Sequence, residues 1–205
     1  MKKAQKHLKK DKNILYTGFG DKGTTTLFDC KQGRISKSAT LIEALGSVDE
    51  LNAYLGVIKV YSDIDEITLK MGNKNILYSK IIEDIQQSLF VIQAELGGSP
   101  IFVSKKELTK LENIINKIAD ILPPITSFTI SGGSITSSSL DYARTLARKS
   151  ERRIISVSVE GSRVVSPDTL SYMNRLSSVL FAMSRYVNHF LSVPENHPDY
   201  NKKNK

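Results

Sequence analysis

The sequence predicts an all-α fold, a five-helix bundle, and two observations carry this prediction. Apolar residues recur every three or four positions through five long stretches of the 205-residue chain, which is the period of a helix with one buried face. No two neighbouring stretches show the two-residue alternation that is typical of paired strands. We therefore expect a four-helix core plus one extra helix, with ferritin-like up-down packing.

The first two helices are expected over residues 39–61 and 75–96. Apolar residues from Leu41 to Ile58 keep helical spacing in the first stretch, and the second stretch repeats the pattern. Glycine and proline at positions 97–100 then stop the second helix, because glycine loses the most backbone entropy on folding and proline lacks an N–H.

The third helix is expected to begin at Ser104 and to end near residue 122. Ser104 and Glu107 match the capping-box pattern, in which each side chain bonds the other residue's backbone N–H. Pro123 and Pro124 follow, and the residue before a proline disfavours the helical region.

The fourth helix is expected over residues 134–159. Its β-branched run 154–159 could instead form a strand, but no neighbouring segment offers that strand a partner. The fifth helix is expected from the segment 166–168 to residue 191, because Ser-Pro-Asp supplies an N-cap, a first-turn proline and an acid at the positive end of the helix dipole.

The length indicates one domain, and the charge is concentrated at its ends. The chain carries a formal net charge of +8, and residues 1–12 alone contain six lysines. We expect a disordered basic tail at 1–13, a helical domain at 14–193 and a flexible tail at 194–205. No nucleic-acid partner is expected, since no aromatic residue is interleaved with the lysines for base stacking.

Several other classes are excluded by composition. The single cysteine, Cys30, allows no internal disulfide, and His7, His189 and His197 lie near the chain ends, which argues against a histidine-based metal site or catalytic triad. No apolar run approaches the roughly 20 residues that span a bilayer, and the first residues do not resemble a signal peptide. A cytoplasmic protein with no membrane partner is therefore expected.

A glycine- and threonine-rich segment lies within an irregular region at residues 14–37. Its glycines let backbone N–H groups approach an anion, while Lys22 offers a point charge for a phosphate. The segment lacks a Walker P-loop pattern, so a flexible surface loop is the alternative. Lys37, where the first helix begins, is a second candidate cation.

The fourth helix carries a charged stripe. Arg144, Arg148, Glu151 and Arg152 fall within roughly 100° of arc on one helical face. Three arginines against one acid leave positive charge that a polyphosphate or a partner carboxylate would neutralise, whereas a solvated face with local ion pairs is the alternative.

Three further features are open to two interpretations each. Asn174 could bond a base or ribose, or make a bond between helices. The Asp49-Glu50 pair could perform acid–base chemistry, or form an ion pair with an arginine across an interface. Phe128, in a loop before Gly132, could anchor the core or form a wall for a flat ligand.

The order of these features along the chain is more specific than any one of them. The stretches concerned are Tyr16-Thr17 with Gly20 to Thr25, Gly46 to Asn52, Arg144 with Arg148 and Glu151 to Arg153, and Tyr172 to Ser177 with Arg185-Tyr186. From about residue 16 to residue 188 the chain thereby resembles the PduO-type ATP:corrinoid adenosyltransferases.

The resemblance implies an activity and its reactants. The expected enzyme transfers the 5′-deoxyadenosyl group of ATP to Co(I) of a corrinoid such as cobalamin and releases tripolyphosphate, as in cobalamin biosynthesis. It uses Mg²⁺ held mainly through the ATP phosphates, with no metal ligand expected from protein side chains. A homotrimer with ATP between adjacent subunits is implied, and a flavoprotein reductase is a further expected partner. The alternative is a non-catalytic carrier or sensor bundle that binds ATP or a corrinoid.

The resemblance also assigns roles to residues. Phe128, beside the cobalt, and Arg148 are the expected catalytic residues, while Asp49 and Arg144 are expected to pair across a subunit boundary. The residues expected to bind ATP are Thr17, Gly18, Phe19, Gly20, Lys22, Thr25, Thr26, Lys37, Arg148, Lys149, Ser150, Glu151, Arg152 and Asn174.

The chain departs from the family pattern at a few positions. Ser131 stands where the family commonly has proline, which frees φ and restores an N–H, so a more mobile loop is expected. Ser178 replaces a frequent aspartate, and Phe19 replaces a small polar residue in the nucleotide loop. Residues 29–33 are a residue or two longer than is common.

Overall fold

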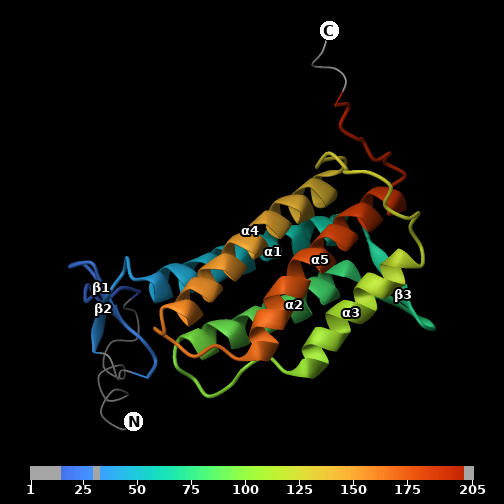
Figure 1. The fold of residues 1–205 in the computed structure, drawn as a ribbon. Helices are drawn as coiled ribbons and strands as arrows, with labels where there is room; N and C mark the ends of the chain where they lie inside the picture. Colours follow the sequence, from blue (N-terminus) through green and yellow to red (C-terminus); the bar gives the residue numbers. More distant parts are fainter. Residues whose placement is uncertain (1–14, 30–32, 201–205) are drawn as a thin grey trace.

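The computed structural model describes residues 15–29 and 33–200. Across these residues the architecture is a helical bundle (Figure 1), which confirms the all-α prediction. The five helices are α1 (Thr40–Ile64), α2 (Tyr78–Leu96), α3 (Lys105–Ala119), α4 (Ile135–Val159) and α5 (Pro167–Phe190).

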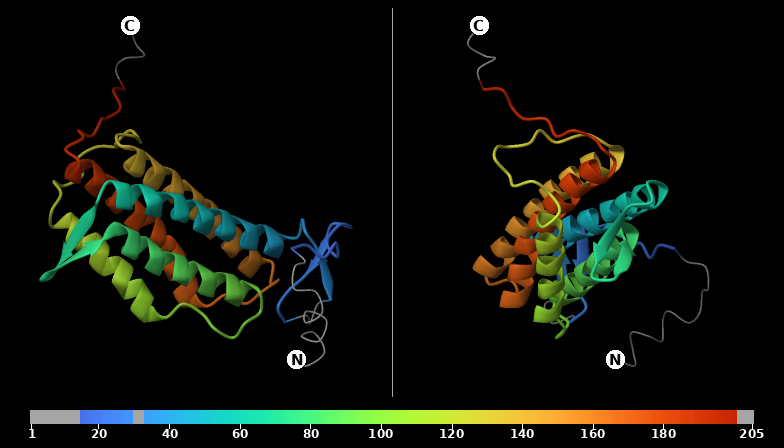
Figure 2. Two further views of the ribbon diagram at one scale, coloured as in Figure 1. Left: turned by 180° about the vertical axis from the view of Figure 1, so that it is seen from behind. Right: turned by 90° about the vertical axis from the view of Figure 1, so that its right-hand side faces the viewer.

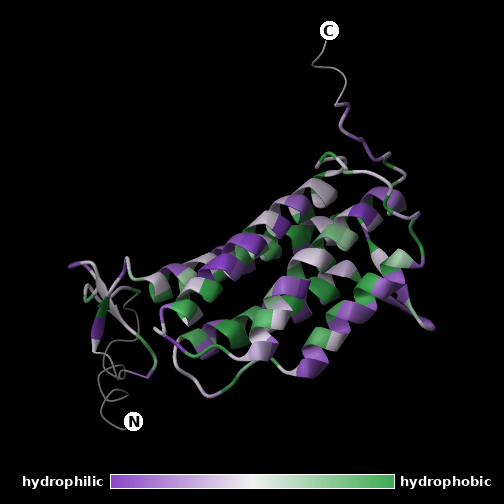
Figure 3. Ribbon diagram, viewed as in Figure 1, coloured by the Kyte–Doolittle hydropathy of each residue, from purple (hydrophilic) through white to green (hydrophobic). Residues whose placement is uncertain are grey.

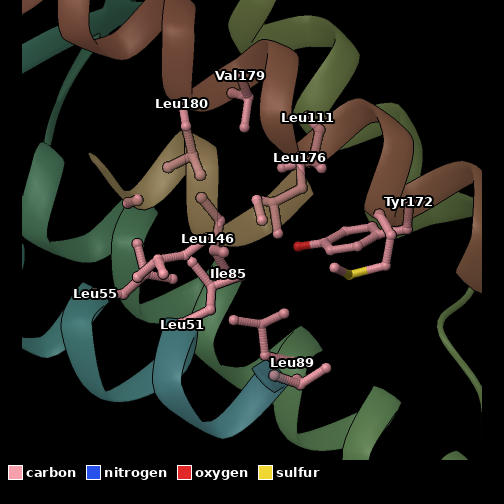
Figure 4. Close-up of a cluster of buried hydrophobic side chains, with 14 of the residues drawn as sticks. Leu51, Leu55, Ile85, Leu89, Leu111, Leu146, Tyr172, Leu176, Val179 and Leu180 are labelled. Atoms are coloured by element: carbon pink, nitrogen blue, oxygen red, sulfur yellow. The ribbon is translucent and has the colours of Figure 1, made fainter. Parts of the chain in front are cut away.

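The core lies between the helices, where their apolar faces meet. Helix α4 packs between α5 and α1, while α2 packs on α1 and α3 packs on α5. Leu51, Leu89, Leu146 and Leu176 come from four different helices and converge in one buried cluster (Figure 4). The hydropathy colouring shows the complementary arrangement, with polar residues along the outer faces (Figure 3).

Two short hairpins were not expected from the sequence. Strands β1 (Thr24–Thr26) and β2 (Arg34–Ser36) pair antiparallel with Thr25 opposite Ile35, inside the region expected to be irregular. Their β-branched residues suit a pleated pair. Strands β3 (Thr68–Met71) and β4 (Lys74–Leu77) pair between α1 and α2. The expectation that the chain holds no strand pair is therefore wrong.

The β3–β4 hairpin explains why α2 starts later than expected. Gly72 adopts a φ of 60° in the two-residue connection, a conformation that glycine takes without steric cost. Residues 75–77 consequently belong to a strand rather than to the first turn of α2. The Tyr186 hydroxyl donates to the Thr68 carbonyl oxygen at 2.8 Å, which ties the hairpin to α5.

The helix starts agree with the sequence in one case and differ in another. Ser166 caps α5 as expected, since its hydroxyl oxygen accepts from the Thr169 N–H at 3.2 Å. The capping box at Ser104 is not formed: its side chain makes no cap bond. The Glu107 carboxylate instead pairs with Lys110 at 2.8 Å, because an ion pair one turn along the helix competes for the same oxygen.

The two ends of the bundle carry different features. The β1–β2 hairpin lies beyond the start of α1, near the end of α4, whereas the loop before α4 and the C-terminal segment lie together at the other end (Figure 2). Helix α4 has 25 residues and so separates these ends by about 37 Å. This separation decides how the candidate site is built.

Candidate functional site

The glycine- and threonine-rich segment folds into tight turns before the β1–β2 hairpin. The Asp21 N–H donates to the Gly18 carbonyl at 3.2 Å, and the Gly23 N–H donates to the Gly20 carbonyl at 3.1 Å. Gly18 and Gly23 have φ values of 70° and 74°, which other residues rarely adopt. The segment is thus an ordered turn structure rather than a featureless loop.

Arg34 holds this segment together, a role that the sequence did not reveal. Its guanidinium donates to the hydroxyl and to the carbonyl oxygen of Thr24, both at 2.8 Å, and also to the Phe19 carbonyl oxygen. One side chain therefore bridges the first turn and strand β1. Because the strand pairing was not expected, Arg34 had no visible partner in the sequence.

Lys37 directs its ammonium group over the turns. A Cβ atom added to Gly20 would lie 2.9 Å from the Lys37 Nζ, so the two residues are in direct contact. Lys22 is exposed on the same segment, as are Thr17, Gly18 and Phe19. The Lys37 ammonium group and the exposed backbone around Gly20 therefore lie together, while an anion site here stays a prediction.

A pocket of about 470 Å³ opens between this segment, α1 and α4. Its charged walls hold three cations and two carboxylates, and Lys149 pairs with Glu50 at 2.6 Å. Arg153 likewise pairs with Glu43 at 3.0 Å. We call it the nucleotide-end pocket; it is lined by Thr25, Lys37, Ile42, Glu43, Gly46, Ser47, Glu50, Lys149 and Arg153.

The side chains of residues 148–152 point to different sides of α4, as expected for consecutive helical residues. Lys149 turns toward α1 through Glu50, while the Glu151 carboxylate accepts from the Asn174 amide of α5 at 2.9 Å. Arg148 and Arg152 are exposed. Ser150 is fully buried and its hydroxyl donates to the Ser47 carbonyl at 2.8 Å, so it faces the core and not a solvent-accessible site.

Phe128 lies at the opposite end of the bundle with Arg144. The residue is 78% exposed, which excludes the core-anchor interpretation within this chain. A pocket of about 380 Å³, which we call the Phe128 pocket, contains Phe128, Asp141, Arg144 and Phe181. The Arg144 Nε is buried without a hydrogen-bond partner among the described residues, so one donor of this guanidinium is left unsatisfied within the described chain.

Asp49 and Glu50 do not act as a pair in this chain. The Gln93 amide of α2 donates to the Asp49 carboxylate at 3.2 Å, whereas Glu50 binds Lys149 of α4. The two carboxylates therefore contact different helices, which does not favour joint acid–base work. Asp49 and Arg144 form no ion pair within the described chain.

The donor chemistry of the described residues does not offer a protein metal site. Within residues 15–29 and 33–200, no group of three or more His, Cys, Asp or Glu side chains is placed to hold a metal ion. Among the helices of the same residues, none combines the length and the apolar character needed to cross a bilayer.

A sequence profile describing cobalamin adenosyltransferases matches residues 15–187, which is most of the chain. This chain belongs to the cobalamin adenosyltransferase family.

Individual relatives agree with the family assignment. The chain is 36% identical over 182 residues to the corrinoid adenosyltransferase PduO of Citrobacter freundii, matching 85% of this chain and 50% of that protein. The chain spans about half the length of the PduO relatives that it matches. It is also 34% identical to the corrinoid adenosyltransferase of Bacillus subtilis, matching 85% of this chain and 86% of that protein.

Solved structures of the same family share the fold. A phenylalanine-to-histidine variant of the PduO-type ATP:corrinoid adenosyltransferase from Lactobacillus reuteri, complexed with cobalamin and ATP, superposes with a TM-score of 0.78 at 28% identity. The match covers 91% of this chain and 97% of that chain. An arginine-to-lysine variant of that enzyme, complexed with ATP, gives a TM-score of 0.76.

Proposed function

We propose that this adenosyltransferase-family protein transfers the 5′-deoxyadenosyl group of ATP to Co(I) of a corrinoid, in a site shared between two subunits of a homotrimer. The corrinoid adenosyltransferase relatives support the reaction class. The Lactobacillus reuteri structure with cobalamin and ATP supports the choice of reactants.

The main support for a site shared between subunits is the distance between the Lys37 segment and the Phe128 loop within one chain. The reaction joins C5′ of ATP to cobalt, so the nucleotide and the corrinoid must lie within bonding distance. In one chain, the segment with Lys37 and the loop with Phe128 lie at opposite ends of α4, about 37 Å apart. A neighbouring subunit can place its Lys37 segment beside the Phe128 loop. A single subunit cannot bring its own Lys37 segment and Phe128 loop together.

Two faces of α4 are consistent with a site that two subunits share. Arg148, Glu151 and Arg152 are on the stripe that turns away from α1, and Glu151 is held by Asn174. This stripe is open to a partner, while Lys149 and Arg153 face the nucleotide-end pocket of the same chain. One subunit would thus supply the turn segment and its neighbour the arginine stripe.

The chemistry requires no protein nucleophile. Co(I) of the corrinoid substrate donates an electron pair to C5′, the C5′–O bond breaks, and its electron pair leaves with tripolyphosphate. The protein positions the reactants and stabilises the charge that grows on the leaving group. Lys22, Lys37 and Arg148 are suited to this, since charge-assisted bonds to phosphate are strong.

Magnesium enters this proposal as part of the nucleotide. Mg²⁺ would be held mainly by the triphosphate oxygens, because it prefers hard oxygen donors. No step of the proposed reaction depends on a metal held by the protein.

The roles of Phe128 and Arg148 have a second line of support. In the Lactobacillus reuteri enzyme, the phenylalanine and the arginine that were substituted lie twenty residues apart. Phe128 and Arg148 show the same spacing here. We place the exposed Phe128 ring against the lower face of the corrinoid, where it would exclude water and the lower axial ligand and so ease reduction of Co(II).

The test is a direct assay of the purified chain. ATP, Mg²⁺ and chemically reduced cobalamin are added, and the conversion of Co(I) to an alkyl-cobalt species is followed by absorbance together with release of tripolyphosphate. Stoichiometric formation of both products is the expected result. Binding of ATP and cobalamin without either product would instead indicate a carrier or sensor and would overturn the proposal.

A further inference from the structure

The apex of the Phe128 loop is bonded to the C-terminal segment of the chain. The Ile130 N–H donates to the Asn196 carbonyl oxygen at 2.7 Å. The His197 Nδ1 lies 2.9 Å from the Phe128 carbonyl oxygen and 2.9 Å from the Ser127 hydroxyl. The segment and the loop run together at this end of the bundle (Figure 1). We call these contacts the C-terminal clasp.

The base and the apex of the loop are held by different parts of the molecule. At the base, the Gly132 N–H donates to Asp141 of α4 at 3.3 Å, and the Asn188 amide of α5 donates to the Gly132 carbonyl at 3.0 Å. At the apex, each hydrogen bond found among the described residues leads to the C-terminal segment. The Phe128 ring itself is exposed, so its direction follows the backbone of the apex.

The C-terminal segment is itself anchored firmly enough to act as a support. Glu195 makes a two-point bond to the Arg185 guanidinium, with distances of 2.6 and 3.0 Å. Arg185 is buried, and it also donates to the Pro123 carbonyl at 3.3 Å, where the Phe128 loop begins. Bidentate carboxylate–arginine bonds fix orientation as well as distance. One buried arginine of α5 therefore sets both the tail and the start of the loop.

The geometry also assigns the proton on His197. A carbonyl oxygen can only accept, so the contact with Phe128 requires a hydrogen on Nδ1. The Ser127 hydroxyl oxygen then shares that hydrogen as a second acceptor. The imidazole thus acts as a donor to the backbone of the residue whose ring faces the Phe128 pocket.

We propose that His197 is a positioning residue for Phe128, and that the C-terminal clasp sets the placement of the aromatic ring against the corrinoid. The inference rests on the proposed function. Among the described residues, the hydrogen bonds that hold the apex of the loop all lead to the C-terminal segment, so this segment supplies the restraint.

The clasp is tested first without any substrate. Amide hydrogen exchange of residues 127–131 is measured for the full chain and for three variants, His197→Ala, His197→Asn and His189→Ala. We expect about tenfold faster exchange at Ile130 in His197→Ala. His197→Asn should retain slow exchange, since its amide N–H replaces the Nδ1–H. His189→Ala, an exposed histidine on α5, should match the parent, and unchanged exchange in His197→Ala overturns the clasp.

The positioning role is tested by kinetics and by the cobalt spectrum. With Co(II) substrate and a reductant, His197→Ala should lower kcat about tenfold and change the KM for ATP less than about twofold. The electron paramagnetic resonance spectrum of bound Co(II)alamin should show less of the form that has lost its lower axial ligand. His197→Asn should restore both.

Each failure has a separate meaning. If the parent protein makes no adenosylated product, the proposed function is wrong, whatever the exchange data show. If the parent is active and His197→Ala exchanges faster but keeps the parental kcat and spectrum, the positioning role is wrong. Thermal melts of all variants establish that they are folded.

Discussion

At the scale of single residues, Phe128 is a large apolar side chain that the fold leaves in solvent. Because the residue is 78% exposed, removing its ring costs the single chain little packing. We predict that Phe128→Ala keeps its ATP affinity but loses turnover from Co(II) substrate by at least about tenfold, or about 1.4 kcal/mol of barrier. Phe102→Ala, a half-exposed loop phenylalanine elsewhere, is the matched control. Unchanged turnover in Phe128→Ala contradicts the role.

Tyr78 presents the opposite case, a polar atom without a partner. The residue is fully buried against the ring of Tyr186, with centroids 5.5 Å apart, and its hydroxyl has no hydrogen bond among the described residues. We predict that Tyr78→Phe raises the free energy of unfolding by about 1 kcal/mol, since the unpaired hydroxyl no longer has to be desolvated. Tyr186→Phe should lower it, because that hydroxyl bonds Thr68. Urea titration measures both changes.

The same tyrosine gives a pH dependence. Burial raises the pKa of Tyr78 well above the value of 10.0 for a free phenol. Above that pH the unfolded chain loses the proton while the folded chain keeps it, so stability falls as pH rises. The free energy of unfolding should fall less steeply with pH in Tyr78→Phe than in the parent protein. Equal slopes in the two proteins would argue against a raised pKa of Tyr78.

At the scale of elements, the glycine- and threonine-rich segment is fastened to the bundle by a partly buried ion pair at its C-terminal side. Asp29 and the Arg163 guanidinium lie 2.8 Å apart, and Arg163 also donates to the Leu96 carbonyl at the end of α2. Gly98 leaves the space for this, since a Cβ there would lie 2.6 Å from the Asp29 carboxyl group. The position of the segment thus depends on a glycine outside it.

We predict that Gly98→Ala raises the KM for ATP severalfold and destabilises the fold by about 2 kcal/mol or more, because strain at φ +99° adds to the clash. Gly161→Ala is the matched control, since φ there is +70° with open space around it. The control should show the strain without the rise in KM. Equal KM values for ATP in the two variants would contradict the proposed role of Asp29 in positioning the segment.

The elements also show what a sequence can predict. All five helices were expected because 15 to 25 residues give enough periods to define a buried face. The hairpins were missed because strands of three or four residues carry almost no period, and their pairing depends on partners elsewhere. Helical spacing placed Arg148 and Glu151 together, but treating residues 148–152 as one binding run overlooked that Ser150 turns inward.

At the scale of the whole molecule, Asp49 and Arg144 remain a predicted contact between subunits. Asp49 is exposed on α1, and the Arg144 Nε is buried without a partner in the described chain. Removing either partner should weaken the proposed trimer by about 3–5 kcal/mol, because it strands the other charge at the proposed interface. A double-mutant cycle followed by sedimentation measures the coupling, and a coupling energy near zero would refute the pair.

A shared site also predicts complementation between defective subunits. Lys37→Ala and Arg148→Ala should each be nearly inactive alone, because each destroys one half of every site. Mixed before assembly in equal amounts, they should regain about a quarter of parental activity, the fraction of interfaces that combine two intact halves. Mixing Lys37→Ala with itself at the same concentration is the control. No recovery in the mixture would place both halves in one subunit.

The two ion pairs of the nucleotide-end pocket bear on the proposed binding of ATP. Glu50 and Glu43 already neutralise Lys149 and Arg153, so phosphates that bind there as proposed would exchange one anionic partner of these cations for another. Added salt weakens the resident carboxylate pairs as well as the phosphate contacts. Nucleotide binding should therefore decline less steeply with ionic strength than a count of the pocket's positive charges would suggest.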